Sequence, residues 1–212
     1  MKKTRKILLM AACAVLLVCI SVGATVAYLT SEDSVTNTFT VGKVAIKLDE
    51  APVDANGTKV DGVRVKANNY KLLPGHTYDK DPMVTVLSGS EPAYIKMTVT
   101  FSKASALDTI FAPDGATLTD IFNGYDAANW IAKGNTKDAA NDTRTYEFWY
   151  KETVGALNGD VALDALFDSI TVPGDITNEQ LATIGGMTIT VNAYAIQADG
   201  FANADAAWKA YK

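Results

Sequence analysis

The sequence has very few of the side chains that support cysteine or histidine chemistry. Its 212 residues include two cysteines, Cys13 and Cys19, and one histidine, His76. Both cysteines lie in one apolar run near the N-terminus. A chain cleaved after that run contains no cysteine, which excludes disulfides, thiolate nucleophiles and cysteine metal sites from it. Proline is scarce, with six residues, and 48% of the residues are hydrophobic, so the composition is that of a folding chain.

Acidic residues outnumber basic residues over most of the chain. Four of the 19 (Lys2, Lys3, Arg5 and Lys6) precede the apolar run, which leaves 15 basic residues against 24 acidic ones. Neutralising the phosphates of nucleic acid requires a basic face. We therefore predict that nucleic acid is not a partner.

Residues 1–27 follow the order of a secretory signal peptide. The basic residues precede an apolar run from Ile7 to Ile20, and a small-residue sequence ends at Ala27. We predict cleavage between Ala27 and Tyr28, and hence a secreted protein that contacts the membrane only through its leader before cleavage. The alternative is a retained transmembrane anchor, because about 20 apolar residues can span a bilayer.

Strand patterns dominate the rest of the chain. The clearest is 93–101, where every second residue is apolar, as in a strand with one buried face. Further strands are predicted at 44–48, 60–65, 83–87, 145–150 and 187–195.

Helical patterns are short, and one long loop is expected. Helices are predicted at 105–111, 160–170, 177–184 and 203–211. Thr177 and Gln180 have the spacing of a capping box. The loop is residues 123–142, rich in Gly, Asn, Asp and Ala. Because strands outnumber helices and do not alternate with them, we predict a mainly β fold, an antiparallel sandwich.

The candidates for catalysis or metal binding are isolated residues. His76 stands in a turn with no HExxH or paired-histidine spacing, and the chain has no G-x-S-x-G sequence. Asp49, Glu50, Asp79 and Asp81 offer carboxylates suited to Ca²⁺, but none belongs to a D-x-[DN]-x-[DN]-G loop. We predict no catalytic residue, no metal and no cofactor.

Two spaced sets of residues have both a structural and a functional interpretation. Aspartates at 160, 164 and 168 have the spacing of the solvated face of a helix. The three tryptophans are predicted to be buried or half-buried, and the alternative is stacking against sugars. They are Trp130, Trp149 and Trp208.

Several segments together resemble the TasA/camelysin family of exported matrix-fibre proteins of Gram-positive bacteria. The first is the signal end, Gly-Ala-Thr-Val-Ala at 23–27, followed by Tyr-Leu-Thr-Ser-Glu-Asp-Ser-Val-Thr-Asn-Thr-Phe-Thr-Val-Gly at 28–42. The others are Leu-Pro-Gly at 73–75, the run from Asp-Pro-Met-Val at 81–84 to Tyr-Ile-Lys-Met-Thr-Val at 94–99, and Ile-Thr-Val-Asn-Ala-Tyr-Ala-Ile-Gln at 189–197.

This resemblance implies a jelly-roll-like sandwich and assembly through the N-terminal segment. In fibre-forming members that segment pairs as a strand with the next subunit. Here it is 28–42, and its self-assembly anchors are Leu29, Val35 and Phe39. The implied partners are other copies of the chain or a related matrix protein, and a dedicated signal peptidase during export.

We therefore expect a secreted structural protein of the extracellular matrix or cell surface. Its expected parts are a signal peptide (1–27), a candidate donor strand (28–42) and a single β-sandwich domain (43–212). The alternative is a monomeric surface adhesin or carbohydrate-binding module. The third possibility is a camelysin-like metalloprotease, for which the sequence has no zinc motif.

Overall fold

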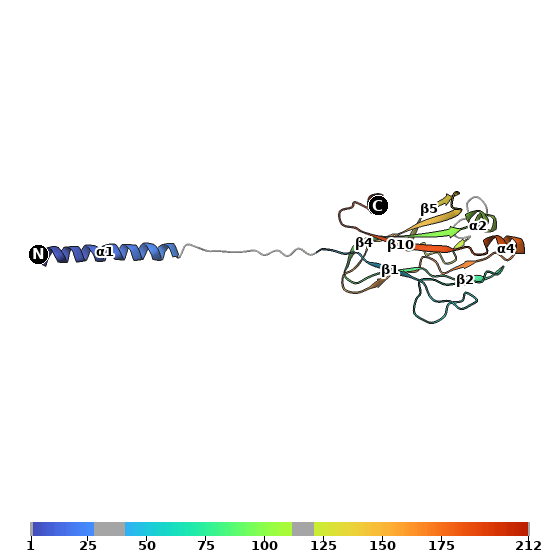
Figure 1. Ribbon diagram of the computed structural model, residues 1–212, viewed down its shortest axis with the longest axis horizontal. Helices are drawn as coiled ribbons and strands as arrows, with labels where there is room; N and C mark the ends of the chain where they lie inside the picture. The colour runs from blue at the N-terminus through green and yellow to red at the C-terminus, as the bar shows by residue number, and fades with distance from the viewer. Residues whose placement is uncertain (1, 28–40, 112–120, 212) are drawn as a thin grey trace. The chain divides into compact units, whose positions relative to one another are not determined.

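The computed structural model describes residues 2–27, 41–111 and 121–211, and it describes side chains in the first range only for 3–16 (Figure 1). The chain divides into two compact units, Met1–Val41 and Gly42–Lys212. In the first unit, helix α1 (Lys2–Ala27) contains the basic residues and the apolar run. Among the described residues, no helix is both long enough and apolar enough to cross a membrane.

The second unit is mainly β, and all of its paired strands are antiparallel. Its largest sheet has the order β10-β4-β6-β5, with β7 also paired to β4. These strands are β4 (Ser90–Ser102), β5 (Trp130–Asp138), β6 (Thr143–Tyr150), β7 (Val154–Ala156) and β10 (Ile189–Gln197).

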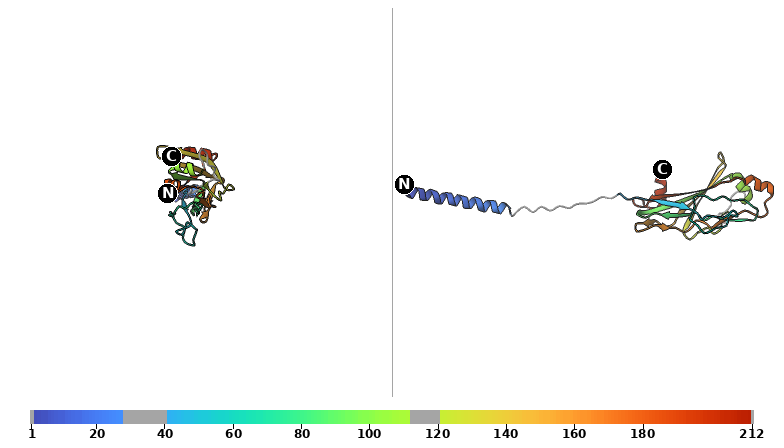
Figure 2. Two further views of the ribbon diagram at one scale, coloured as in Figure 1. Left: turned by 90° about the vertical axis from the view of Figure 1, so that its right-hand side faces the viewer. Right: turned by 60° about the horizontal axis from the view of Figure 1, so that its bottom comes forward.

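Two smaller sheets complete the β structure. One has the order β1-β3-β8 and the other consists of β2 and β9. The strands are β1 (Ile46–Asp49), β2 (Thr77–Asp79), β3 (Met83–Val86), β8 (Val161–Ala162) and β9 (Ser169–Thr171). Figure 2 shows the layered arrangement of these strands and the β5–β6 hairpin extending beyond them.

The core lies between the sheets and is rich in aromatic residues. The predicted alternation of strand 93–101 is confirmed, because Ala93, Ile95, Met97, Val99 and Phe101 are completely buried. The centre of the Phe122 ring lies 4.5 to 5.9 Å from the centres of four neighbouring rings. These edge-to-face and tilted aromatic contacts add to the stabilisation that comes from burying apolar area. The neighbours are Phe101, Tyr146, Phe148 and Phe167.

Short helices begin where the sequence supplies caps. Helix α4 (Asn178–Ile184) has the predicted capping box: the Thr177 side chain accepts from Gln180 N, and Gln180 accepts from Thr177 N. Helix α5 (Ala204–Ala210) is capped by Asn203. Helix α2 (Ala104–Phe111) buries Leu107 and Phe111 against the core.

Three sequence-based predictions of local structure are wrong. Residues 160–170 form no helix, because their backbone bonds to other segments: Leu163 N–H donates to Val84 O and Leu166 N–H to Pro82 O. Residues 123–142 contain β5, whose polar side chains are exposed on both faces and show no alternation. Residues 60–65 form no strand, and Val65 makes an isolated β-bridge with Glu50.

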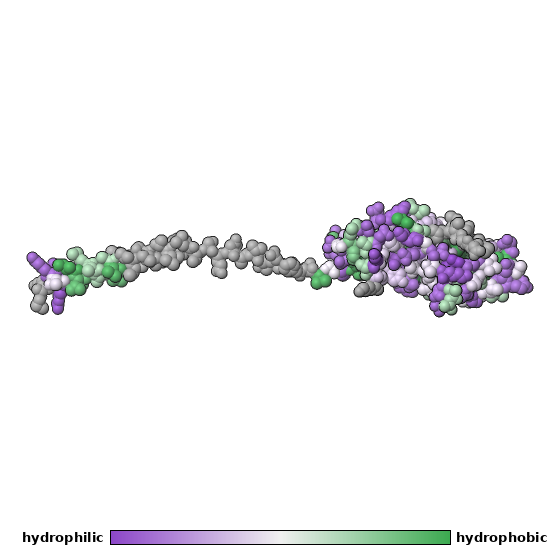
Figure 3. Space-filling view, turned by 90° about the horizontal axis from the view of Figure 1, so that it is seen from above, coloured by the Kyte–Doolittle hydropathy of each residue, from purple (hydrophilic) through white to green (hydrophobic). Residues whose placement is uncertain are grey.

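The surface of the second unit is mostly polar. The face drawn in Figure 3 is hydrophilic over most of its area, with small separate hydrophobic patches. Large apolar residues exposed on this unit include Val63, Leu73 and Leu157.

Candidate functional site

Strand β10 lies at one end of the large sheet and has one unpaired edge. This strand pairs with β4 over all nine of its residues, from Ile189 opposite Phe101 to Gln197 opposite Ala93. Within the described ranges, no strand pairs with its other edge. An unpaired edge presents a row of backbone donors and acceptors that another chain can satisfy.

Two hydrogen bonds show which β10 residues point to that edge. Ser102 N–H donates to Thr188 O at 3.0 Å, and Ala198 N–H donates to Pro92 O at 2.8 Å. Alternate residues of an antiparallel strand bond to the same neighbour. The even-numbered residues from 188 to 198 therefore bond toward β4. The backbone groups of the odd-numbered residues between them point to the unpaired edge.

These odd-numbered residues also face the core, and they are incompletely covered. Their partners on β4 are completely buried, whereas Ile189, Val191, Ala193 and Ala195 are only partly buried. The same contrast separates β1 from β3: Val84 and Val86 are completely buried, but the apolar residues of the β1 segment are half-buried. Those residues are Val44, Ile46 and Leu48.

Strands β1 and β10 are in contact although they belong to different sheets. We name the half-buried apolar residues of these two segments the open seam; they are Val44, Ile46, Leu48, Ile189, Val191, Ala193 and Ala195. The sandwich is closed along β3 and β4 and incompletely closed along the open seam. Apolar side chains left partly in water gain free energy when another segment covers them.

The opposite edge of the same sheet differs in the features that discourage pairing. Strand β5 includes Lys133 and Lys137, and its register shifts between Ala132 and Gly134. Lysines and bulges are the usual protection of an edge strand. Strand β10 has a continuous register and no charged residue or proline. The edge of β10 therefore lacks this protection.

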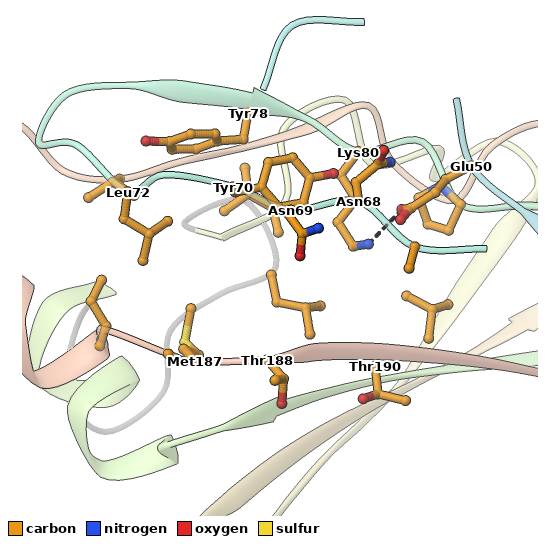
Figure 4. Close-up of a pocket in the computed structure, with 18 of the residues that line it drawn as sticks. Glu50, Asn68, Asn69, Tyr70, Leu72, Tyr78, Lys80, Met187, Thr188 and Thr190 are labelled. Atoms are coloured by element: carbon orange, nitrogen blue, oxygen red, sulfur yellow. Dashed lines mark hydrogen bonds and ion pairs between the residues drawn. The ribbon is translucent and has the colours of Figure 1, made fainter. Parts of the chain in front are cut away.

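A cavity of about 850 Å³ adjoins one end of the open seam (Figure 4). One wall is formed by residues 187–191, and the facing wall includes residues 65–70 and Leu72. In Figure 4, Met187 points toward the cavity, whereas Thr188 and Thr190 point away from it. A cavity of this size can accommodate large side chains of an incoming segment.

A buried ion pair lies at the cavity wall. Lys80 Nζ donates to Glu50 Oε2 at 2.6 Å, and both side chains are at least nine-tenths buried. Beside them, Tyr70 OH donates to Asp79 O at 3.0 Å. Burial, followed by the nearby carboxylate of Glu50, raises the pKa of Tyr70 well above its usual value. The phenol therefore stays neutral at physiological pH.

Arg64 joins two carboxylates from different segments. Its Nε donates to Asp49 Oδ1 at 2.6 Å and its Nη1 to Asp81 Oδ2 at 3.1 Å. Burial alone would raise the pKa of both carboxyl groups, but hydrogen bonds and charge attraction from Arg64 and lysines outweigh it, so that the pKa of each is lowered. The lysines are Lys47 at Asp49 and Lys59 at Asp81.

A second cluster lies on the outer face of the large sheet. Lys96 Nζ is 4.6 Å from the centre of the Trp208 ring, and Lys133 Nζ is 3.9 Å from that of Trp149. These are cation–π distances. Trp130 and Trp208 are buried and Trp149 is half-buried, in agreement with the structural interpretation of the tryptophans.

The other predicted site residues are placed as follows. Tyr28, Leu29, Val35 and Phe39 lie outside the described residues, and Ala27 is described only as the last residue of α1. The single histidine is half-buried in its turn, where Nε2 donates to Asn56 O at 2.6 Å. In the ranges that the structure describes, no three His, Cys, Asp or Glu side chains form a group that could hold a metal ion.

The aspartates at 160, 164 and 168 are not on a helix and do not form one face. Asp160 accepts from Ser88 N and Asp164 accepts from Asn129 Nδ2, so these two aspartates each hold a loop to a neighbouring loop. Sequence reasoning missed the open seam and the Arg64 network. The uncharged nine-residue pattern at 189–197 was a usable signal for an unprotected edge, but its unpaired state depends on the tertiary structure.

Comparison of the chain with models of protein families, with curated proteins and with solved structures finds no match.

Proposed function

We propose that this protein is a secreted structural subunit of the extracellular matrix or cell surface, which assembles by β-strand addition. One observation carries the proposal: the unprotected edge of β10 runs beside a row of half-buried apolar side chains. An added strand satisfies the main-chain groups of Ile189, Val191, Ala193 and Ala195 and covers the open seam. Main-chain hydrogen bonds supply the affinity of such pairing, and side-chain pockets supply its specificity.

The occupant that we propose is residues 28–42 of a second copy. This segment follows the predicted cleavage site directly, so it becomes a free N-terminus only after export. Leu29, Val35 and Phe39 are the apolar side chains that it can insert. Pairing of one copy's segment with the next copy's seam joins two different surfaces, which produces open filaments unless the contacts close into a ring.

Membership of the TasA/camelysin family and a jelly-roll topology belong to the same proposal. The segments that carry the resemblance form the strands around the proposed site: residues 81–99 contain β3 and most of β4, and residues 189–197 are β10. Antiparallel sheets with an aromatic core between them support a sandwich of this kind.

The carbohydrate-binding alternative has weaker support. Sugar stacking requires an accessible aromatic ring face, and lysine ammonium groups lie over the rings of Trp149 and Trp208. Trp208 is also only 8% exposed. The third alternative, a metalloprotease, has no support from the described part of the chain.

Electron microscopy of the purified secreted form tests the proposal. We expect concentration-dependent filaments, and shorter ones when residues 28–34 are deleted. A peptide of sequence 28–42 should block growth, and the same composition in scrambled order is its control. Normal filaments from the deleted form would contradict strand addition. Saturable glycan binding by a monomer would favour the adhesin alternative. Cleavage of casein that a chelator inhibits would favour the metalloprotease alternative.

A further inference from the structure

Residues 52–72 form a long segment outside the named strands, which we name the strap, and its last part lines the cavity. Residues 65–70 and Leu72 of the strap line the cavity and face β10 across it (Figure 4). Within the strap, which is described throughout, only Gly57 is buried. Two of its valines, Val60 and Val63, are 41% and 87% exposed. Leu72 is the strap residue that packs, half-buried, against the core, so displacing the strap removes little apolar area from it.

Polar contacts hold the strap in place. Glu50 and Val65 exchange two backbone hydrogen bonds, at 3.0 and 2.7 Å. Arg64 then connects the strap to Asp49 at the end of β1 and to Asp81 before β3. Further along, Tyr70 OH donates to Asp79 O, and Tyr78 OH donates to Lys71 O.

The Arg64 contact is the strongest of these anchors. The Asp49 carboxylate is only 2% exposed and Asp81 is 16% exposed, so the attraction is weakly screened by water. Arg64 also donates from Nη2 to Asp81 O at 2.7 Å, which fixes the guanidinium in one orientation. By contrast, Lys59 reaches the same Asp81 with a side chain that is 58% exposed, and such exposed pairs contribute little.

We propose that the strap is a movable cover of the cavity and that Arg64 is its latch. Segments with few buried apolar contacts open locally while the core stays folded. Releasing Arg64 from Asp49 and Asp81 frees the wall formed by residues 65–70, and the cavity beside β10 becomes accessible from that side. The further step, that opening admits an incoming strand, rests on the proposed function.

The first test measures access to the cavity with a cysteine probe. Val172 lines the cavity and is 2% exposed. We replace it with cysteine in the full-length chain in which Cys13 and Cys19 are serine, and measure labelling by a maleimide under native conditions. Arg64→Met should raise the labelling rate about tenfold or more. Lys59→Met, the matched control on the same strap and at the same Asp81, should change it less than twofold.

Hydrogen exchange separates local opening from unfolding of the whole unit. In Arg64→Met the amide of Val65 should exchange about tenfold faster, while the amides of β4 and β6 keep their protection. Asp81→Asn is the second variant, because it weakens the latch and leaves Arg64 paired with Asp49. Unchanged labelling and unchanged Val65 exchange in both variants would overturn the latch. Faster labelling that accompanies lost protection in β4 would also overturn it.

Filament growth distinguishes this inference from the proposed function. If the strap opens in Arg64→Met and filaments grow faster, both are supported. If the strap opens and neither protein forms filaments, the latch stands and the proposed function fails. If the parent, in which the strap is closed, forms filaments at the same rate as Arg64→Met, the proposed function stands and the role of the strap in strand entry is wrong.

Discussion

At the scale of single residues, Asp49 and Asp81 connect folding stability to pH. Their pKa values are lowered in the folded chain, through Arg64 with Lys47 at Asp49 and with Lys59 at Asp81. A lowered folded-state pKa means that the native state binds protons more weakly than the unfolded chain. The stabilisation is therefore complete above the unfolded pKa of about 3.9 and is lost as the pH falls through the folded values.

We predict from this that the melting temperature is nearly constant from about pH 5 to pH 7 and falls steeply below about pH 4. Arg64→Met should lower the melting temperature at pH 7 and make its fall in acid shallower, because the folded and unfolded states then differ less in how they bind protons at Asp49 and Asp81. Circular dichroism melts across the pH series measure both effects. If the melting temperature falls with pH equally steeply in the parent and the variant, Arg64 does not set this pH dependence.

His76 is predicted to have a minor structural role and no catalytic one. Its ring packs 4.7 Å from that of Tyr78, and its Nε2 donates to Asn56 O. His76→Ala removes both contacts at a half-buried position, so we expect a loss of about 1 kcal/mol in unfolding free energy and an unchanged circular dichroism spectrum. Urea unfolding measures the loss. If the variant abolished a proteolytic activity while folding normally, this assignment would be wrong.

At the scale of elements, β10 allows a test that separates pairing with a partner from folding. Proline lacks the backbone N–H. At Ala193 it removes a donor that points to the unpaired edge, and at Asn192 it removes one that bonds toward β4. Prolines are tolerated on the open side of edge strands.

We predict that Ala193→Pro prevents filament growth while the monomer still folds. Asn192→Pro should destabilise the monomer by about 2 kcal/mol more, because it leaves a buried β4 carbonyl without its donor. Negative-stain microscopy and urea unfolding of the two variants give the comparison. Normal filaments from a folded Ala193→Pro variant would exclude pairing along β10.

The cap of α4 is a purely local prediction. Thr177→Ala removes the side-chain acceptor for Gln180 N, and loss of such a cap costs about 1 kcal/mol. Thr183→Ala is the control, because Thr183 Oγ1 donates to a carbonyl within the same helix and caps nothing. Thermal unfolding should rank the parent and the control above Thr177→Ala, and the reverse order would contradict the capping assignment.

At the scale of the whole molecule, we propose that export and assembly are coupled through residues 28–42. We predict that the secreted form begins at Tyr28, because the preceding small residues end a leader at Ala27. Mass spectrometry of culture supernatant measures the N-terminal mass directly. An intact Met1 terminus found only in membrane fractions would instead indicate a retained anchor.

Elements with local signals could be predicted from the sequence alone. Alternating apolar residues predicted β4, β6 and the greater part of β10, because a strand with one buried face must repeat every second residue. Thr177 and Gln180 predicted the start of α4, because capping acts within one turn. Together these signals were sufficient for a mainly β chain with antiparallel sheets.

Elements that depend on distant partners could be assigned only from the folded structure. Residues 160–170 have helical spacing, but the core buries Leu163, Leu166 and Phe167, and two amides of the segment bond to carbonyls in residues 82–84. Strand β5 has no alternation because both of its faces are exposed, so only its pairing with β6 defines it. The open seam depends on which strand edges remain unpaired. The Arg64 latch depends on contacts of Arg64 with Asp49, 15 residues before it, and with Asp81, 17 residues after it. Such long-range contacts leave no periodic trace in the sequence, because their energy depends on burial and charge separation that exist only after folding.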